Sequence, residues 1–129
     1  MELWEKQILK LDTSVFGSVK LMIDGLTVVF DNQVYRRKIV IAYFVNGVFK
    51  GEYTTPESDI GAKFGSPRYI KHDSKMLAFI KKYKTKKEYE AAKVYKKLYA
   101  FDSKWTSARS LIKHLKSTCK DISIYEEGT

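Results

Sequence analysis

The feature that most restricts the fold is a pair of β-prone segments joined by Asn46-Gly47, within residues 36–54. Asn-Gly is the dipeptide that two-residue hairpins prefer, because both turn positions need a positive φ. A turn there sets Val45 opposite Val48. One face of this hairpin is then apolar and is expected to face the core: Val40, Ala42, Phe44, Phe49 and Tyr53. Residues 39–45 are apolar at both parities, which indicates a central strand covered on both sides.

A second hairpin is indicated upstream, where residues 15–23 and 26–31 flank Asp24-Gly25, another favoured turn dipeptide. Its register pairs apolar side chains on one face: Ile23 with Leu26, Leu21 with Val28, and Val19 with Phe30. The two hairpins are connected at Asn32-Gln33. A tight turn there would put Ile39 and Ile41 on the core face, whereas the Asn46-Gly47 hairpin puts Val40 and Ala42 on it. A bulge or a longer loop near residues 35–38 would resolve the conflict, and so would burial of both faces of the sheet.

Helices are expected in the second half of the chain, because helical spacing replaces strand alternation after residue 72. Residues that commonly cap helices stand at each expected start: Asp73 or Ser74, Thr85, and Thr106 or Ser107. The second helix is expected to continue to about residue 100. The first and third helices are expected to pack on the sheet through apolar side chains: Leu77, Ile80, Leu111 and Leu115.

The predicted fold class is α+β: an antiparallel four-stranded meander sheet over about residues 15–54, followed by two to three helices packed on one face. Residues 121–125 alternate as a short C-terminal strand, and residues 2–11 favour a short helix, although they also suit an extended edge. A chain of 129 residues fits a single domain. Its expected parts are a sheet half (15–54), a connecting loop (55–67), a basic helical half (68–120) and the final strand.

Charge is divided unevenly along the chain. Residues 1–61 hold 7 Lys and Arg against 8 Asp and Glu, whereas residues 62–120 hold 17 against 4. A basic half beside a near-neutral half is typical of a protein with an anionic partner, and it is equally typical of lysines that only keep a protein soluble. Only 4 of the 24 cations are arginine, which favours contacts to phosphate over bidentate readout of bases.

Binding residues are expected where the cations are densest. They are Lys81, Lys82, Lys84, Lys86, Lys87, Lys96 and Lys97, with Arg36, Arg37 and Lys38 as a second cluster. Aromatic residues alternate with lysines over residues 79–105, as in proteins that stack on unpaired bases, and the same spacing fits the buried face of a helix pair. Two hypotheses follow. The protein is a non-enzymatic binder of nucleic acid through phosphate contacts, or it is an interaction module that docks on an acidic protein surface.

Catalytic chemistry is not indicated. His72 and His114 lack metal-ligand spacing, and Cys119 lacks the helix N-terminus that lowers the pKa of a thiol. Four carboxylates are candidates for a nuclease-like magnesium site, although Glu52 follows Lys50 in the reverse of the usual order: Asp31, Glu52, Glu57 and Asp59. We therefore expect no enzyme activity, no metal and no cofactor. With no signal peptide, no apolar run near 18 residues and one cysteine, we expect a cytoplasmic protein with no membrane partner.

Three separated parts of the sequence carry a resemblance. They are Leu3-Trp4-Glu5-Lys6 with residues 11–17, Trp105-Thr106-Ser107-Ala108-Arg109-Ser110-Leu111 with His114-Leu115, and the closing Ile122-Ser123-Ile124. Together they resemble a group of small uncharacterised proteins encoded by phages and prophages. The resemblance implies a mobile-element origin and no particular chemistry. A lysine-rich, arginine-poor composition also fits an AT-rich genome without such an origin.

Overall fold

The computed structural model describes residues 1–125 and has an α+β fold. Its main sheet has five strands in the order β6-β3-β2-β1-β7, and every neighbouring pair is antiparallel. The strands are β1 (Ser18–Ile23), β2 (Leu26–Tyr35), β3 (Lys38–Val45), β6 (Lys104–Trp105) and β7 (Ile122–Ile124). The predicted α+β class and the short C-terminal strand are confirmed, whereas the sheet has five strands and not four.

The β1–β2 hairpin forms in the predicted register, with its turn at Asp24-Gly25. Both turn residues have positive φ, 49° and 82°, as a two-residue turn of this kind requires. The pairing places Leu21 opposite Val28 and Val19 opposite Phe30. All of these side chains are buried, so this hairpin supplies a large part of the core face of the sheet.

The second tight turn lies at Arg36-Arg37 and not at Asn32-Gln33. Strand β2 continues to Tyr35, which pairs with Lys38 across the turn. This later turn removes the parity conflict without a bulge, because Phe30 now faces Tyr43 and Val28 faces Val45. The expected core face of β3, with Phe44 at its centre, is therefore wrong: Tyr43 is 1% exposed and Phe44 is only half-buried.

Strand β3 is covered on both sides, as predicted, since Val40 and Ala42 are buried on the face opposite Ile41 and Tyr43. The Asn46-Gly47 turn forms with positive φ at both residues, but it leads only to a bridge between Val45 and Val48. Residues Gly51–Thr54 then form a 3-10 turn, η2, in place of the expected fourth strand. Strand β6 accounts for this, because it pairs with the edge of β3 that the expected strand would have occupied.

Helices α1 (Leu3–Leu9) and α5 (Ala108–Thr118) cover the core face of the sheet. A 3-10 turn, η1 (Lys10–Thr13), follows α1. Leu111 and Leu115, which were expected to pack on the sheet, are confirmed as buried. Trp4, Ile8 and Leu11 of α1 and η1 are buried as well. The expected loop 55–67 contains a short helix, α2 (Asp59–Phe64), whose N-cap Ser58 accepts a hydrogen bond from the Gly61 amide at 3.0 Å. We call these elements and the main sheet, residues 1–65 and 103–125, the body.

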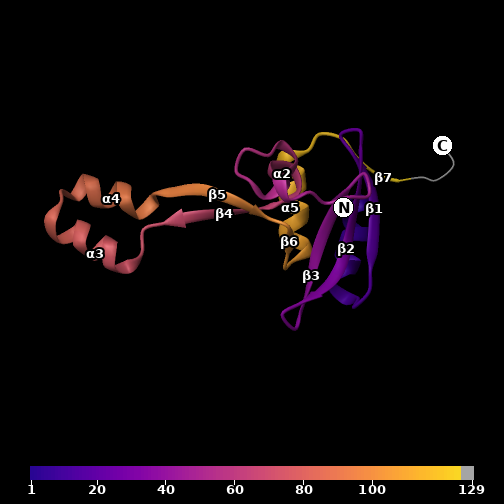
Figure 1. Cartoon of the computed structure of the whole chain (residues 1–129), viewed down its shortest axis with the longest axis horizontal. Helices are drawn as coiled ribbons and strands as arrows, with labels where there is room; N and C mark the ends of the chain where they lie inside the picture. Colours follow the sequence, from indigo (N-terminus) through magenta and orange to yellow (C-terminus); the bar gives the residue numbers. More distant parts are fainter. Residues whose placement is uncertain (126–129) are drawn as a thin grey trace.

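The remaining residues, 66–102, form an arm that extends away from the body (Figure 1). The arm is a two-stranded ribbon, β4 (Ser66–Lys71) and β5 (Lys96–Asp102), which carries the helix pair α3 (Ser74–Tyr83) and α4 (Lys86–Val94) at its far end. The predicted helix starts are confirmed by their caps. The Asp73 carboxylate accepts from the Met76 amide at 2.8 Å, and the Thr85 hydroxyl accepts from the Glu88 amide at 3.2 Å.

Two expectations about this part of the chain are wrong. Helix α4 ends at Val94 and not near residue 100, because residues 96–102 pair with β4 as a strand. The predicted contacts of Leu77 and Ile80 with the sheet are absent from the described core, since α3 and α4 pack on each other at the end of the arm. The expected basic helical half, 68–120, is therefore a protruding arm, one edge strand and one core helix.

Candidate functional site

Most residues of the arm are exposed. Phe101, at its base, is its only residue among the buried apolar side chains of the described chain, and neither α3 nor α4 has a buried residue. Eight large apolar side chains of the arm are exposed: Tyr69, Ile70, Met76, Phe79, Tyr83, Val94, Tyr95 and Tyr99. Of the aromatic series over residues 79–105, only Phe101 and Trp105 belong to a buried face. Phe79, Tyr83, Tyr95 and Tyr99 are exposed, so the alternative in which the aromatics form the core of a helix pair is wrong for these four, whereas Tyr89 is half-buried.

The arm is also where positive charge is concentrated. It holds 11 Lys and Arg against 4 Asp and Glu, whereas the body holds 13 against 9. Two of the arm's cations have acidic partners, Arg68 with Asp102 at 2.9 Å and Lys93 with Glu90 at 3.8 Å. Within residues 1–125 the other nine have no carboxylate within 4.0 Å: Lys71, Lys75, Lys81, Lys82, Lys84, Lys86, Lys87, Lys96 and Lys97. Seven of these nine are binding residues expected from the sequence.

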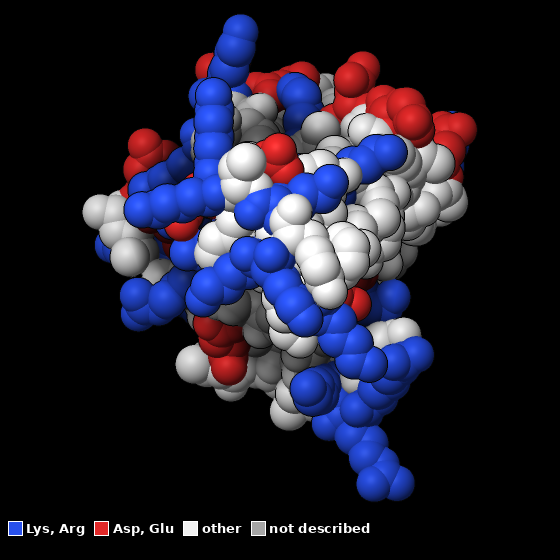
Figure 2. Space-filling model, turned by 90° about the vertical axis from the view of Figure 1, so that its left-hand side faces the viewer, with Lys and Arg blue, Asp and Glu red and all other residues white. Residues whose placement is uncertain are grey.

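Lysine ammonium groups lie beside aromatic rings at separate places on the arm. The Lys96 ammonium lies 4.6 Å from the centroid of the Tyr69 ring, and that of Lys82 lies 5.2 Å from the centroid of Tyr83. At the end of the ribbon His72 stacks on Tyr95, with the ring centroids 4.6 Å apart. Figure 2 views the molecule from the end of the arm and shows Lys and Arg side chains spread over much of that face. Such a surface can offer ammonium groups to phosphates and ring faces to bases.

The second predicted cluster lies at the base of the arm. A hollow of about 380 Å³ opens between the β2–β3 turn and the start of the ribbon. Its lining contains four cations and one acid, Arg36, Lys38, Arg68, Lys104 and Asp102. Arg36 and Lys38 were expected as binding residues, and Arg37 occupies the same turn. Arg68 and Lys104 were missed, because only the ribbon's attachment beside β3 brings them to this turn.

The backbone of this turn is unusual for its side chains. Arg36 and Arg37 have φ values of 50° and 64°, in the left-handed region that favours Gly and Asn. An ordinary L-residue in that conformation costs roughly 1–2 kcal/mol. The chain uses Asp24-Gly25 and Asn46-Gly47 at its other two-residue turns, where the cost is smaller. The Arg36-Arg37 turn therefore has the same backbone conformation as the other two turns, but its residues suit that conformation less well.

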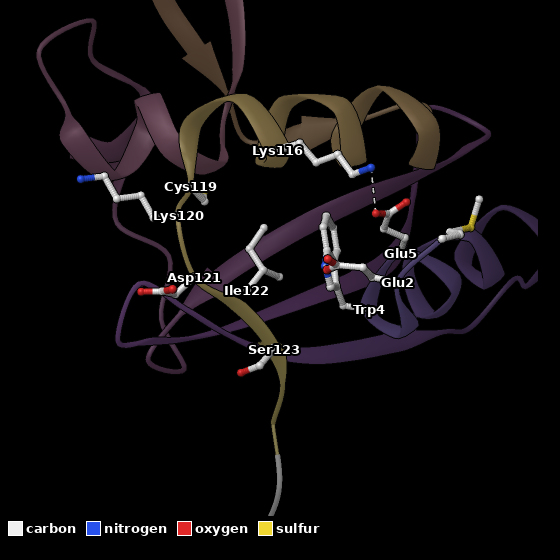
Figure 3. A pocket seen from close by; sticks show the side chains of 10 residues that line it. Glu2, Trp4, Glu5, Lys116, Cys119, Lys120, Asp121, Ile122 and Ser123 are labelled. Carbon is white, nitrogen blue, oxygen red and sulfur yellow. Dashed lines mark hydrogen bonds and ion pairs between the residues drawn. The ribbon is translucent and has the colours of Figure 1, made fainter.

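A larger hollow, of about 860 Å³, lies between the start of α1, the end of α5 and β7 (Figure 3). The Lys116 ammonium contacts the Glu5 carboxylate at 2.8 Å, and Glu5 is 5% exposed. Cys119 also lines this hollow, and burial raises the pKa of its thiol. A thiol with a raised pKa is a poor nucleophile at neutral pH. Among the charged groups that line this hollow, Glu5 and Lys116 pair across the α1–α5 contact.

The four carboxylates that were weighed as a magnesium site are only partly brought together. Glu52, Glu57 and Asp59 line one hollow, while Asp31 lies on β2. Within residues 1–125 no group of three or more His, Cys, Asp or Glu side chains is placed to hold a metal ion. His114 Nε2 lies 2.9 Å from the Ala62 carbonyl, to which its N–H donates, and burial lowers the pKa of the ring. This hydrogen bond ties α5 to α2.

Comparisons with protein-family models, with curated proteins and with solved structures found no match for this chain. None of the helices in the described part of the chain is long and apolar enough to cross a membrane. A function must therefore be inferred from the arm, the hollow at its base and their charges.

Proposed function

We propose that the protein binds nucleic acid through contacts between the arm's lysines and backbone phosphates, and that it catalyses no reaction. The observation that supports this proposal most strongly is the arm itself: 37 residues that project from the body and carry nine cations without an acidic partner among residues 1–125. An element that contributes almost nothing to the core and presents unpaired charge is suited to an external anionic partner. The phage or prophage origin implied by the sequence resemblance stays a prediction.

The dimensions and composition of the arm fit a polyanion. A six-residue strand spans about 20 Å and a ten-residue helix about 15 Å, so the arm can lie beside many successive phosphates. Duplex DNA presents one negative charge per about 1.7 Å of axis, and its major groove of about 12 Å admits a helix or a two-stranded ribbon. Lysine acts as a point charge toward phosphate. Ten of the arm's 11 cations are lysine, which favours affinity over sequence readout.

A docking module for an acidic protein is the second candidate. Met76, Phe79 and Tyr83 are exposed along α3, and the rings of Phe79 and Tyr83 lie 4.9 Å apart. Exposed apolar side chains on a helix are common in protein interfaces. Affinity capture from a lysate with and without nuclease distinguishes the candidates: partners lost on nuclease treatment support nucleic acid, whereas partners that remain support the acidic protein.

The direct test is a titration of labelled single- and double-stranded oligonucleotides at increasing salt. We expect binding at about 50 mM salt, with an affinity that falls with a log–log slope of about −0.9 per phosphate neutralised on duplex DNA. Absence of binding to DNA and RNA of both forms at that salt would contradict the proposal.

A charge-reversal series then tests whether the arm is responsible. Lys82, Lys86 and Lys87, changed to glutamate, alter the net charge by six units, and all three are exposed. The matched control reverses three exposed lysines of the body, Lys10, Lys50 and Lys113. Since surface substitutions usually change stability by less than about 0.5 kcal/mol each, both variants should fold. We expect only the arm variant to lose binding, and equal losses in both would show that net charge alone matters.

A further inference from the structure

We infer that the hollow at the base of the arm is a phosphate-binding site that anchors the nucleic acid against the body. We call it the arginine corner. Its lining cations are Arg36, Lys38, Arg68 and Lys104, and Arg37 follows Arg36 in the β2–β3 turn beside it. This inference rests on the proposed function and extends it from the arm to a second, differently built contact. The ligand is a backbone phosphate of the nucleic acid whose other phosphates contact the arm.

Arginine is concentrated at this place. The chain has four arginines among 24 cations. Arg36 and Arg68 line the hollow, and Arg37 follows Arg36 in the turn beside it. A guanidinium offers several donors in a rigid planar fork that matches two oxygens of one phosphate, whereas an ammonium is a point charge. The corner therefore has the chemistry of a fixed phosphate contact, and the lysine arm has that of a diffuse one.

The backbone gives an independent indication. Asp-Gly and Asn-Gly turns elsewhere in this chain show that residues better suited to positive φ serve its other tight turns. Arg36 and Arg37 occupy the same kind of positions against that preference. Unfavourable backbone conformations concentrate where side chains have a binding role. The turn is thus better explained by what its arginines bind than by the stability of the hairpin.

The charges of the hollow are only partly balanced within the protein. Its acid, Asp102, accepts from the Arg68 guanidinium at 2.9 Å and from the Lys104 amide at 3.0 Å. Within residues 1–125 no carboxylate lies within 4.0 Å of the charged groups of Arg36, Lys38 or Lys104. The Lys104 ammonium lies instead 4.6 Å from the centroid of the Tyr35 ring. The lining has four cations and one acid, and the negative charge of a phosphodiester group would reduce this excess of positive charge.

The corner also lies where an anchor is needed. It joins the β2–β3 turn of the body to the first residues of the ribbon, and the arm leads away from it (Figure 1). A strand of nucleic acid in contact with the arm therefore reaches this hollow at the arm's attached end. Contacts at both places hold the ligand relative to the body as well as to the arm.

The test replaces the turn by the dipeptide that the backbone prefers, as Arg36→Asn with Arg37→Gly. This change removes two cations and suits the positive φ of both positions, so the fold should be retained with an unchanged or raised melting temperature. We expect the affinity for an oligonucleotide at about 100 mM salt to fall at least about tenfold, and the salt slope to shrink by about 1 to 2. The matched control, Lys10→Gln with Lys50→Gln, removes two exposed cations of the body and should lose less than about threefold.

A second variant tests whether the guanidinium group of an arginine is needed or only its positive charge. Arg68→Lys keeps the positive charge, and we expect the affinity to fall by about fivefold because an ammonium cannot offer the planar set of donors with which Arg68 contacts both Asp102 and a phosphate. Unchanged binding by the double turn variant, with binding by the unmodified protein intact, would overturn the corner and leave the proposed function in place. Displacement of the oligonucleotide by micromolar inorganic phosphate would also overturn it, because the site would then serve a free anion. No binding by the unmodified protein would overturn both.

Discussion

The body and the arm use apolar side chains in opposite ways. In the body Phe30, Tyr43 and Phe64 are almost completely buried, whereas in the arm Phe79 and Tyr83 are more than half exposed. Burial of a large apolar side chain stabilises a fold by about 1.5–3 kcal/mol. Apolar burial therefore stabilises the body strongly and the arm only weakly. The difference supports the proposal that the arm's composition serves an external contact more than the needs of folding.

The helices of the arm depend on local interactions more than those of the body do. Helices of nine or ten residues are marginal alone in water, and α3 and α4 rely on their caps, on each other and on the ribbon below them. The body instead connects distant segments, as where the Asp24 carboxylate accepts from the amides of Lys120 and Asp121. We therefore expect the arm to be the region that gains most order when a ligand binds.

The largest expected contrast comes from one substitution made in each region. Phe30→Ala removes a fully buried ring from the body and should lower the free energy of unfolding by about 3–5 kcal/mol. Phe79→Ala removes a ring that is 53% exposed and should lower it by less than about 1 kcal/mol. Urea denaturation measures both. A similar loss for the two variants would show that the arm has a buried core of its own.

A smaller contrast concerns two ion pairs. In the body, the amide of Asp121 and the Lys63 ammonium, at 2.7 Å, hold the pKa of Asp24 at about 2, below its ordinary 3.8. A lowered pKa in the folded state adds stability that is complete above pH 4 and is lost as the pH falls through about 2. Asp24→Asn keeps a turn-forming residue and should cost about 2 kcal/mol at pH 7. This difference should shrink between pH 4 and pH 2.

The matched change in the arm is Asp102→Asn, which breaks the pair with Arg68. Both side chains of that pair are more than a third exposed, and exposed pairs contribute at most about 1 kcal/mol. Thermal denaturation across the acid range compares the two variants. A pH-independent loss for Asp24→Asn would contradict the role of its charge in the body.

The parts of the fold that sequence could predict are those with local chemical signals. Asp24-Gly25 marks its turn, and Asp73, Thr85 and Ser107 mark helix starts, because each side chain satisfies nearby backbone groups. The Arg36-Arg37 turn has no such signal, since neither residue favours positive φ. Residues 96–102 fit a helix as well as a strand, and only pairing with β4 decides between them.

The candidate site also has residues that the sequence could predict and residues that it could not. The lysines of residues 81–97 could be found from charge density alone, and the structure leaves them exposed on the arm. Arg68 and Lys104 could not, because their approach to Arg36 depends on β6 pairing with β3 at residues distant in sequence. The failure of Leu77 and Ile80 to reach the sheet has a related cause. A helix with an apolar stripe indicates a partner face, but not whether that face belongs to the same chain.

The most direct test of the arm's role is to remove its end. Lys71 and Lys96 face each other across the ribbon, so residues 72–95 can be replaced by Asn-Gly, which suits a two-residue hairpin turn. We expect the free energy of unfolding to change by less than about 1 kcal/mol, because the deleted residues contribute nothing to the core. The affinity for nucleic acid should fall at least about 100-fold, since seven lysines leave with the deleted segment. A shortened protein that binds as tightly as the full chain would contradict the arm as the binding element.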